Sequence, residues 1–412
     1  MKDRIEKLSN INELLMLKLR RNVVLDYIYA FICNLNMSNS IWVLYLTYRG
    51  MNLLQIGLLE GIFHITGMFT EIPSGAMADL FGRKRSMIVG RIFLTMSCIV
   101  MLFSRNFMGF AFGFILHAWS YNFNSGSEEA LLYDSLKMID REESYAKING
   151  KINFVIEVSQ GIAIVTGGVL AEISYNWCYF VCIVIALLCF MPLVFMTEPP
   201  VKSEKTVKEK LSSVLSHHFK TSWNIVKNDK RIFFIVVYYS IIFTAYTVLL
   251  FYSQQFFQNH GLNKIQISII MLFAGLSACA GALSSNMLMR IMKDKLAVLG
   301  ACGIAFCILT FGFNNLYLSA FTLVIASFFN SVLYPAQSSI LNALIPSQQR
   351  ATLISLNSMA FSIVMVLVFP IVGGLADVWN LSVVFAGLGV FMIIGIAIVQ
   401  IFLRHEGKLF SL

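Results

Sequence analysis

The chain contains 412 residues, of which 58% are hydrophobic and only 13% are charged. A soluble protein of this length needs far more charge on its surface, so the composition excludes an ordinary soluble domain. The formal net charge of +9 would suit a nucleic-acid-binding protein. That function is disfavoured because the basic residues are scattered between apolar runs and form no single patch.

Apolar runs of about 20 residues recur along the chain, and each is long enough to cross the ~30 Å hydrocarbon layer of a bilayer. They predict an all-α membrane protein with twelve transmembrane helices, at 22–48, 54–81, 86–104, 107–137, 146–174, 177–197, 231–258, 264–292, 295–313, 316–344, 350–378 and 381–403. The first run lacks the short apolar region and the small-residue cleavage site of a signal peptide. We therefore expect it to remain in the mature protein.

The basic residues predict the topology, because Lys and Arg collect in cytoplasmic loops. On the predicted map, all but three of the 31 basic residues fall on the side of the N-terminus, and the exceptions are Arg49, Arg105 and Lys264. Arg91, in the third run, is counted on this cytoplasmic side. The sequence therefore predicts that both termini are cytoplasmic. Without a targeting segment, we expect the protein in a bacterial inner (plasma) membrane.

One long polar stretch divides the chain. Segment 198–230 contains two prolines and a Lys-rich run, with six predicted spans before it and six after it. We expect an N-terminal six-helix bundle at 1–197, a cytoplasmic linker at 198–230 and a C-terminal six-helix bundle at 231–412. A constant shift of 206 residues aligns two glycine motifs of the halves, Gly75-Ala76-Met77 with Gly281-Ala282-Leu283 and Gly167-Gly168 with Gly373-Gly374. This favours two pseudo-symmetric bundles, an architecture in which transporters bind substrate at the midplane.

The most specific motif is the turn between the second and third predicted spans, Gly75-Ala-Met-Ala-Asp79-Leu-Phe-Gly82-Arg83-Lys84-Arg85. Gly75 would let two helices pack closely, Gly82 would permit the chain reversal, and Arg83 could hold Asp79 across the turn. The spacing G-x-x-x-D-x-x-G-R-K resembles the loop 2–3 signature of the major facilitator superfamily of transporters. With twelve spans and two halves, the resemblance extends over essentially the whole chain.

The resemblance implies a gate on the cytoplasmic side. In this family the intact turn pairs with an acid at the inner end of the fourth span, where this chain has Asp134. By resemblance, Asp79, Arg83 and Asp134 form a charge cluster that latches the outward-open state. The implied gating motif comprises Gly75, Asp79, Gly82, Arg83, Lys84 and Asp134. The alternative is a topology anchor without a gating role.

Two other signatures of the family are altered. The fourth-span motif usually has an arginine four residues before a glycine, and here Asn122 precedes Gly126. The fifth-span motif of antiporters keeps its double glycine, Gly167-Gly168, and has lost its proline. These departures put proton antiport in doubt and leave the fold unaffected.

Ionisable side chains inside a span are costly unless they face a wet cavity or a partner, so each is a candidate for function. In the second run, Glu60, His64 and Glu71 share one helical stripe. Glu157 lies ~15 Å from the cytoplasmic start of the fifth run. The predicted proton-coupling residues are Glu71 and Glu157, then Glu129 or Glu128, then Asp26, with His64 as a further candidate. The alternatives are that Glu60 extends to the outer rim and that His64 bonds a neighbouring helix.

The substrate cavity is predicted from amides and aromatic hydroxyls. One face of the fifth run carries the amides Asn153 and Gln160. The seventh and tenth runs are rich in aromatic and amide groups, which suit lipophilic or cationic ligands. The candidates are Asn153, Gln160, Tyr238, Tyr239, Tyr246, Asn330, Tyr334 and Gln337. No Lys or Arg is predicted at mid-membrane, so an anionic substrate would find no fixed counter-charge. Neutral or cationic amphiphiles are favoured, and sugars stay open.

The eight cysteines form no C-x-x-C pair, which argues against a disulfide framework or a metal site. No nucleophile–base pair or phosphate-binding loop indicates an enzyme or a cofactor site. The sequence thus predicts a monomeric secondary transporter that exports amphiphilic small molecules by alternating access, driven by the proton gradient. The alternatives are an importer or facilitator of a small nutrient, and a non-transporting sensor or lipid-handling protein. The bilayer and a small substrate are the expected partners, and nucleic acid is not.

Overall fold

The computed structural model describes residues 2–200, 230–293, 295–344 and 350–406. These residues are helical, with short turns between the helices and no β-strand in the described ranges. Ten helices of the described chain are long and apolar enough to cross a membrane. They correspond to ten of the predicted spans, all except the first and the fourth. Of the predicted linker, residues 201–229 lie outside the described residues.

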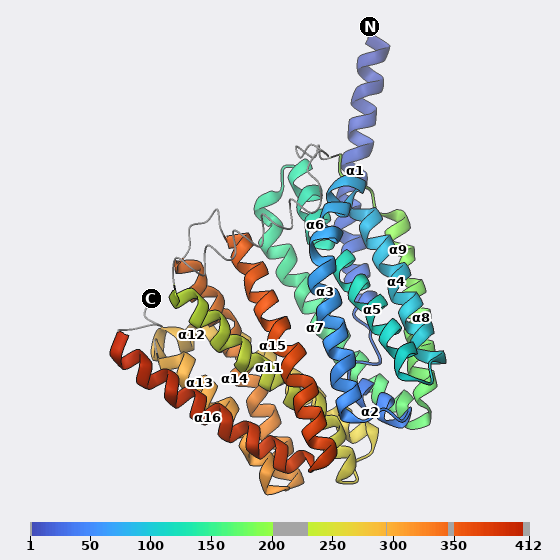
Figure 1. Ribbon diagram of the computed structural model, residues 1–412. Helices are drawn as coiled ribbons and strands as arrows, with labels where there is room; N and C mark the ends of the chain where they lie inside the picture. The colour runs from blue at the N-terminus through green and yellow to red at the C-terminus, as the bar shows by residue number, and fades with distance from the viewer. Residues whose placement is uncertain (1, 201–229, 294, 345–349, 407–412) are drawn as a thin grey trace. The chain divides into compact units, whose positions relative to one another are not determined.

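The helices gather into two compact units, and α3 (Leu53–Phe81) contributes to both (Figure 1). Of the described residues, the first unit contains 2–39 and 66–200. Besides the end of α3, its helices are α1 (Lys2–Cys33), α4 (Arg83–Phe103), α5 (Phe107–Asn124), α6 (Ser127–Met138), the 3₁₀ turn Glu142–Ser144, α7 (Tyr145–Ile173), α8 (Tyr175–Leu188) and α9 (Phe190–Phe195).

Of the described residues, the second unit contains 40–65, 230–293, 295–344 and 350–406. It begins with α2 (Trp42–Tyr48) and the start of α3. Its other helices are α11 (Lys230–Asn259), α12 (Lys264–Met292), α13 (Lys295–Thr310), the 3₁₀ turn Phe311–Phe313, α14 (Leu316–Leu344), α15 (Arg350–Val378) and α16 (Leu381–Glu406). Segment 40–65 therefore packs with helices that follow it in the chain, with contacts between residues 199 to 324 positions apart. The predicted division at 197 and 231 stays a prediction.

Small residues bring helices close together in the first unit. A Cβ on Gly90 of α4 would lie 3.1 Å from the carbonyl oxygen of Ser120 on α5. On the same face of α4, Ser86 and Ser97 donate hydrogen bonds to backbone oxygens of α5, of 2.7 and 2.8 Å. Serine and glycine at such spacing allow two helix backbones to approach closely. In a membrane, where the hydrophobic effect does not drive helices together, such packing and hydrogen bonding hold them together.

The same device joins α12 and α14 in the second unit. Gly281 packs directly on the backbone of Phe328, and Ser277 and Ser285, one turn away on either side, donate to carbonyl oxygens of α14 at 2.7 and 2.9 Å. Gly75, the residue aligned with Gly281, behaves differently. A Cβ at position 75 would meet nothing within 4 Å, so the expected close packing at Gly75 is absent from the described structure.

The first predicted span is not one helix. Helix α1 ends at Cys33 and α2 begins at Trp42. The residues between them include three asparagines and two serines, whose side chains compete for backbone hydrogen bonds. Asn34 donates to the carbonyl oxygen of Ala30 at 2.8 Å, and Asn36 accepts from the backbone of Ser38 at 3.1 Å. These local bonds replace the helical ladder and end α1.

The fourth predicted span is also broken. Helix α5 ends at Asn124 and α6 begins at Ser127, with Gly126 between them at a φ of 74°. Glycine adopts this left-handed conformation without the steric cost that other residues incur. Glu128 and Glu129 consequently lie in the first turn of α6, and not in the interior of one long helix.

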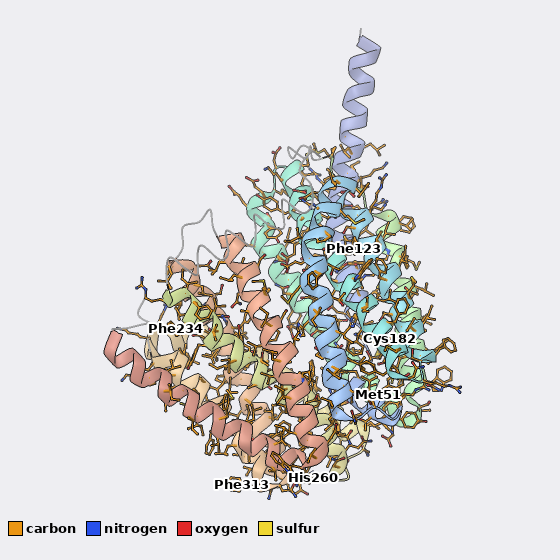
Figure 2. The ribbon with its side chains drawn as sticks, in the orientation of Figure 1. Met51, Phe123, Cys182, Phe234, His260 and Phe313 are labelled. Atoms are coloured by element: carbon orange, nitrogen blue, oxygen red, sulfur yellow. The ribbon has the colours of Figure 1, made fainter. Side chains whose placement is uncertain are left out.

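Large apolar side chains cover much of the surface of both units. Phe103, Phe154 and Phe313 are each about 70% or more exposed. Phe313, labelled in Figure 2, lies in the turn between α13 and α14. Exposed apolar surface on this scale is unfavourable in water. It is the expected outer surface of helices that contact lipid.

Candidate functional site

The predicted gating turn lies where α3 ends and α4 begins. Gly82 separates the two helices with a φ of 103°, a conformation that favours glycine. Asp79 Oδ1 lies 2.5 Å from Arg83 Nη1, and Asp134 Oδ2 of α6 lies 4.0 Å from Arg83 Nε. The structure thus brings together the three charged residues that the motif predicts, with one cation between two acids.

Glu198 adds an acid that the sequence analysis did not assign. Its carboxylate accepts hydrogen bonds from the backbone N–H groups of Arg83 (2.6 Å) and Lys84 (2.8 Å), the first two residues of α4. The N-terminus of a helix carries unpaired N–H groups and a partial positive charge, so a carboxylate is stabilising there. A Cβ on Gly82 would lie 2.8 Å from the Glu198 carboxyl carbon. Glycine is therefore favoured at position 82 by its φ, and a larger residue would also have to displace the Glu198 carboxyl group.

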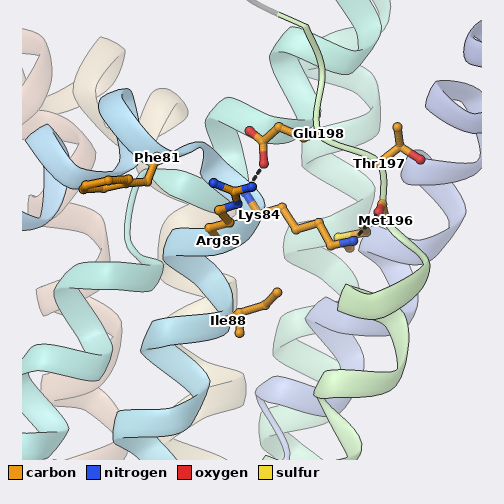
Figure 3. A pocket seen from close by; sticks show the side chains of 7 residues that line it. All are labelled: Phe81, Lys84, Arg85, Ile88, Met196, Thr197 and Glu198. Carbon is orange, nitrogen blue, oxygen red and sulfur yellow. Dashed lines mark hydrogen bonds between the residues drawn. The ribbon is translucent and has the colours of Figure 1, made fainter.

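While Glu198 caps the N-terminus of α4, Lys84 on α4 caps the C-terminus of α9 (Figure 3). Its ammonium group donates to the carbonyl oxygens of Val194 (3.0 Å) and Met196 (2.7 Å) at the C-terminal end of α9. Each helix end thus receives a charge of the sign that its dipole favours. A pocket of about 610 Å³ lies beside these two helix ends. It is lined by Phe81, Lys84, Arg85, Ile88, Met196, Thr197 and Glu198. The only signal for Glu198 in the sequence was its position directly after the sixth apolar run.

The predicted acids of the second span differ in their surroundings. Glu60 Oε1 lies 3.6 Å from His64 Nε2, and His64 Nδ1 is 3.2 Å from the Ser362 hydroxyl of α15. His64 therefore bonds a neighbouring helix, which is one of the two roles considered for it. Glu71 is exposed. Of the predicted stripe on α3, the end with Glu60 and His64 is thus packed, and the end with Glu71 is exposed.

The fifth-span candidates also divide. Gln160 on α7 donates to Asn34 Oδ1 at 3.3 Å, and its neighbour Ser159 donates to the carbonyl oxygen of Phe31 at 2.6 Å. These bonds attach α7 to the end of α1. Asn153 and Glu157 are exposed. Of the predicted amide and acid face, only the half nearer the predicted cytoplasmic side is open.

Asn122, which replaces the arginine of the fourth-span motif, connects α5 to α3. Its side-chain N–H group donates to the carbonyl oxygen of Gly67 (2.7 Å) and to the hydroxyl of Thr70 (2.6 Å). Where the motif has a charged arginine, Asn122 is neutral and makes two hydrogen bonds.

Arg91 is the largest difference between prediction and structure. It lies eight residues into α4, or ~12 Å from the start of the helix at 1.5 Å per residue, and is only 5% exposed. Its guanidinium lies over the ring of Tyr29, 5.4 Å from the centroid. Arg91 is thus buried inside α4, within the third predicted span; the expectation that no Lys or Arg lies at mid-membrane stays a prediction. Buried against α1, this arginine is not open to a substrate.

Two of the predicted acids lie near Arg91. Glu128 accepts a 3.1 Å hydrogen bond from Asn124, which in turn accepts one from the Tyr29 hydroxyl. Glu128 is within electrostatic range of both Arg91 and Asp26, and Asp26 is 1% exposed. Glu129, the next residue, is exposed. The sequence could not pair these residues, because their helices are separated in the chain.

The aromatic candidates of the second unit are mostly packed. The hydroxyls of Tyr238 and Tyr246 donate to Ala297 (3.2 Å) and Ser327 (3.0 Å), and Gln337 donates to Asn357 (2.6 Å). Tyr239 is fully buried. Among the other predicted cavity residues, Asn330 is half-buried, and Tyr334 is 64% exposed with its ring near Phe243. Tyr334 is thus the most exposed of the predicted cavity residues in the second unit.

Sequence comparison matches this chain to a known family. The model of the Major Facilitator Superfamily matches residues 27–311 and 287–409. An uncharacterized MFS-type transporter of Bacillus subtilis (strain 168), YxaM, is 25% identical over 374 residues, covering 89% of this chain and 92% of that protein. The quinolone resistance protein NorA of Staphylococcus aureus (strain MRSA252) is 22% identical over 209 residues, covering 50% of this chain and 52% of NorA.

Solved structures share the fold. The nucleoside transporter NupG superimposes with a TM-score of 0.77 at 12% identity, over 95% of this chain and 100% of the other. A D-xylose-proton symporter superimposes with a TM-score of 0.63 at 15% identity, over 93% of this chain and 97% of the other. At these identities the likeness is one of fold alone.

Proposed function

Because this chain belongs to the Major Facilitator Superfamily and is a multi-pass membrane protein, we propose that it is a secondary transporter that works by alternating access. In this proposal it has twelve spans in two six-helix bundles, with both termini in the cytoplasm. It resides as a monomer in a bacterial inner membrane. Transporters built from repeated bundles bind substrate near the midplane and expose it to each side in turn.

The observation that carries the proposal is the charge cluster at the turn between α3 and α4. Arg83 lies between Asp79 and Asp134, at 2.5 and 4.0 Å. These side chains are 19–33% exposed, so the pairs can form and separate without the large desolvation cost of a buried ion pair. An interaction that is cheap to break suits a gate, and the Glu198 cap on α4 keeps Arg83 in place for it.

For the substrate we propose neutral or cationic amphiphilic molecules, exported in exchange for protons. The similarity to NorA, named for quinolone resistance, supports drug export. The burial of Arg91 against Tyr29 supports it as well, since that guanidinium is not open to an anionic substrate. The exposed acids Glu71 and Glu157 supply negative charge that a cation or a proton can neutralise.

The experiment measures how much of a fluorescent lipophilic cation accumulates in cells that contain the protein. Wild type is compared with Glu71→Gln and Glu157→Gln, each with and without a protonophore. Glu172→Gln, an exposed acid near the other end of α7, is the matched control. Export predicts lower accumulation in wild type and in the control, and loss of that difference with the protonophore. Accumulation equal to that of cells without the protein for the whole panel of cations would contradict drug export.

An importer or facilitator of a small nutrient is the second candidate. Its support is the fold shared with a nucleoside transporter and a sugar symporter. It predicts saturable uptake that is independent of Glu71. A sensor or a lipid-handling protein is a third reading, and it predicts no movement of a soluble substrate. The charge cluster at Arg83 argues against that reading, because ion pairs that form and separate easily are expected in a protein that changes between two conformations.

A further inference from the structure

The pocket beside the gating turn gathers basic side chains from two helices. It lies where α3 ends, α4 begins and α9 ends, and Lys84 and Arg85 line it (Figure 3). Arg21 of α1 reaches the same end of α9, where its guanidinium donates a 2.8 Å hydrogen bond to the carbonyl oxygen of Phe195. We call Arg21, Lys84 and Arg85 the basic rim.

The acids near the basic rim are engaged elsewhere. Both carboxylate oxygens of Glu198 accept hydrogen bonds from the first two N–H groups of α4, and Asp79 and Asp134 pair with Arg83. Within the described part of the chain, no acid lies at ion-pair distance from a residue of the basic rim. One carboxylate thus faces three cations, and the pocket keeps a net positive charge.

Apolar side chains form the rest of the pocket and its surroundings. Phe81, Ile88 and Met196 contribute to the lining. Phe81 is 57% exposed, and Met191 and Val194 of the adjoining α9 are 60% and 64% exposed. Exposed apolar surface of this kind is expected where helices contact lipid. A ligand that fits the pocket therefore combines a negative charge with an apolar body.

The pocket lies at the level where the chain enters the membrane. From Arg83 onward, α4 is long and apolar enough to cross a bilayer, and on the proposed topology this end of the helix faces the cytoplasm. Phospholipid phosphates lie at the same level, and basic pockets between transmembrane helices on this side suit anionic head groups. A zwitterionic head group brings a cation of its own, which the basic rim repels.

We propose that this pocket binds the phosphate head group of an anionic phospholipid from the inner leaflet. Arg85, which is exposed, pairs with the phosphate, and Lys84 and Arg21 add to the positive charge around it. Phe81 and Ile88 contact the glycerol and the start of the acyl chains. The lipid is a bound ligand that joins α3, α4 and α9, and not a transported substrate, so the inference goes beyond the proposed function.

A tryptophan at position 81 reports which lipid occupies the pocket. Full-length Phe81→Trp protein is reconstituted into mixed vesicles of phosphatidylglycerol and phosphatidylcholine, with bromine on the chains of one lipid or of the other. Bromine quenches tryptophan fluorescence on contact, and the signal of the five native tryptophans is measured on the parent protein and subtracted. Phosphatidylglycerol should be preferred at position 81 by about fivefold, the effect of one basic residue on an anionic lipid.

Variants separate the role of Arg85 from that of charge in general. Arg85→Gln should remove the preference, and Arg85→Lys should keep most of it. Because the side chain is exposed, neither change should prevent folding. Arg105→Gln is the matched control, since Arg105 is an exposed arginine just beyond the other end of α4, and it should leave the preference unchanged. Phe306→Trp, on an apolar stretch of α13 and 60% exposed, reports bulk lipid and should show no such preference.

Two results would overturn the proposal directly. One is equal quenching by the two lipids at position 81, and the other is a preference that survives in Arg85→Gln. Inorganic phosphate tests the free anion as the alternative ligand. Compared with chloride at equal ionic strength, phosphate should leave the preference in place, and loss of the preference would assign the pocket to the free anion instead of the lipid. No outcome depends on the transport of a cation, so the proposed function is tested separately.

Discussion

The carboxylate of Asp377 caps α3 at Leu53, although the two residues are 324 positions apart in the chain. Asp377 Oδ1 accepts a 2.9 Å hydrogen bond from the backbone N–H of Leu53, and Oδ2 accepts one of 2.8 Å from Leu54. The Tyr252 hydroxyl donates to the carbonyl oxygen of Leu53 at 2.8 Å. The start of α3 is thus held by α15 and α11, which explains why segment 40–65 belongs to the second unit.

Replacing Asp377 should destabilise this attachment. Asp377→Ala removes both acceptors from the N-terminus of α3, and loss of such a cap costs ~1 kcal/mol. Asp377→Asn keeps one acceptor oxygen and should lose less. Thermal unfolding of the purified variants measures the difference. A melting temperature of Asp377→Ala equal to that of wild type would show that the cap contributes nothing.

Gly57 should be intolerant of any side chain. A Cβ at this position would lie 2.6 Å from the Cα of Pro370 on α15, so even alanine requires the two helices to separate. We expect Gly57→Ala to cost ~1–3 kcal/mol, as overpacking does. Gly67→Ala on the same helix is the control, because a Cβ there meets nothing within 4 Å. That control should be neutral or slightly stabilising, since alanine is the better helix former. Equal effects of the two changes would mean that the contact with Pro370 is unimportant.

Gly82 and Glu198 should show coupled effects. Gly82→Ala suffers both a φ of 103° and a clash with the Glu198 carboxyl group. Gly126→Ala suffers a φ of 74° alone, since a Cβ at position 126 meets nothing within 4 Å. We expect Gly82→Ala to lose more stability, and Glu198→Ala to relieve part of the excess in the double variant. The double-mutant cycle is measured by chemical or thermal unfolding, and strict additivity would contradict the contact.

The ion pair between Asp79 and Arg83 should matter more for transport than for stability. Partly exposed pairs contribute ~0–1 kcal/mol to folding, so Asp79→Asn should leave the melting temperature nearly unchanged. If the pair forms in only one of the two access states, its loss should shift their populations by up to about fivefold, and the transport rate should fall with it. Cation export and thermal unfolding are measured on the same variant. Asp140→Asn, which changes an exposed acid on the turn after α6 of the same unit, is the control and should leave both unchanged.

The sequence predicted most of the helices, because the membrane imposes a strong and local constraint. Each span needs about 20 apolar residues with every backbone group bonded internally, and this requirement can be read from composition alone. It fails at two places. Asn34 and Asn36 form local hydrogen bonds that end α1, and Gly126 breaks the fourth span. Both breaks lie inside apolar runs, where hydropathy does not detect them.

The gating turn was predictable because its residues are adjacent. Asp79 and Arg83 are one helical turn apart, so their spacing alone implies contact. Asp134 was predicted as a partner from the family resemblance, and the structure places it at 4.0 Å. Glu198 was missed because its bonds go to backbone N–H groups, which carry no sequence signal.

By itself the sequence determined the membrane class, the approximate helix positions and the family, because these depend on hydropathy, charge bias and a local motif. Only the tertiary structure decided which charges meet. Arg91 reads from the sequence as one more basic residue near a cytoplasmic turn, and in the folded chain it lies buried against Tyr29. The reason is physical. The environment of a side chain depends on helices packed from distant parts of the chain, and periodicity within one helix gives its face without naming the neighbour.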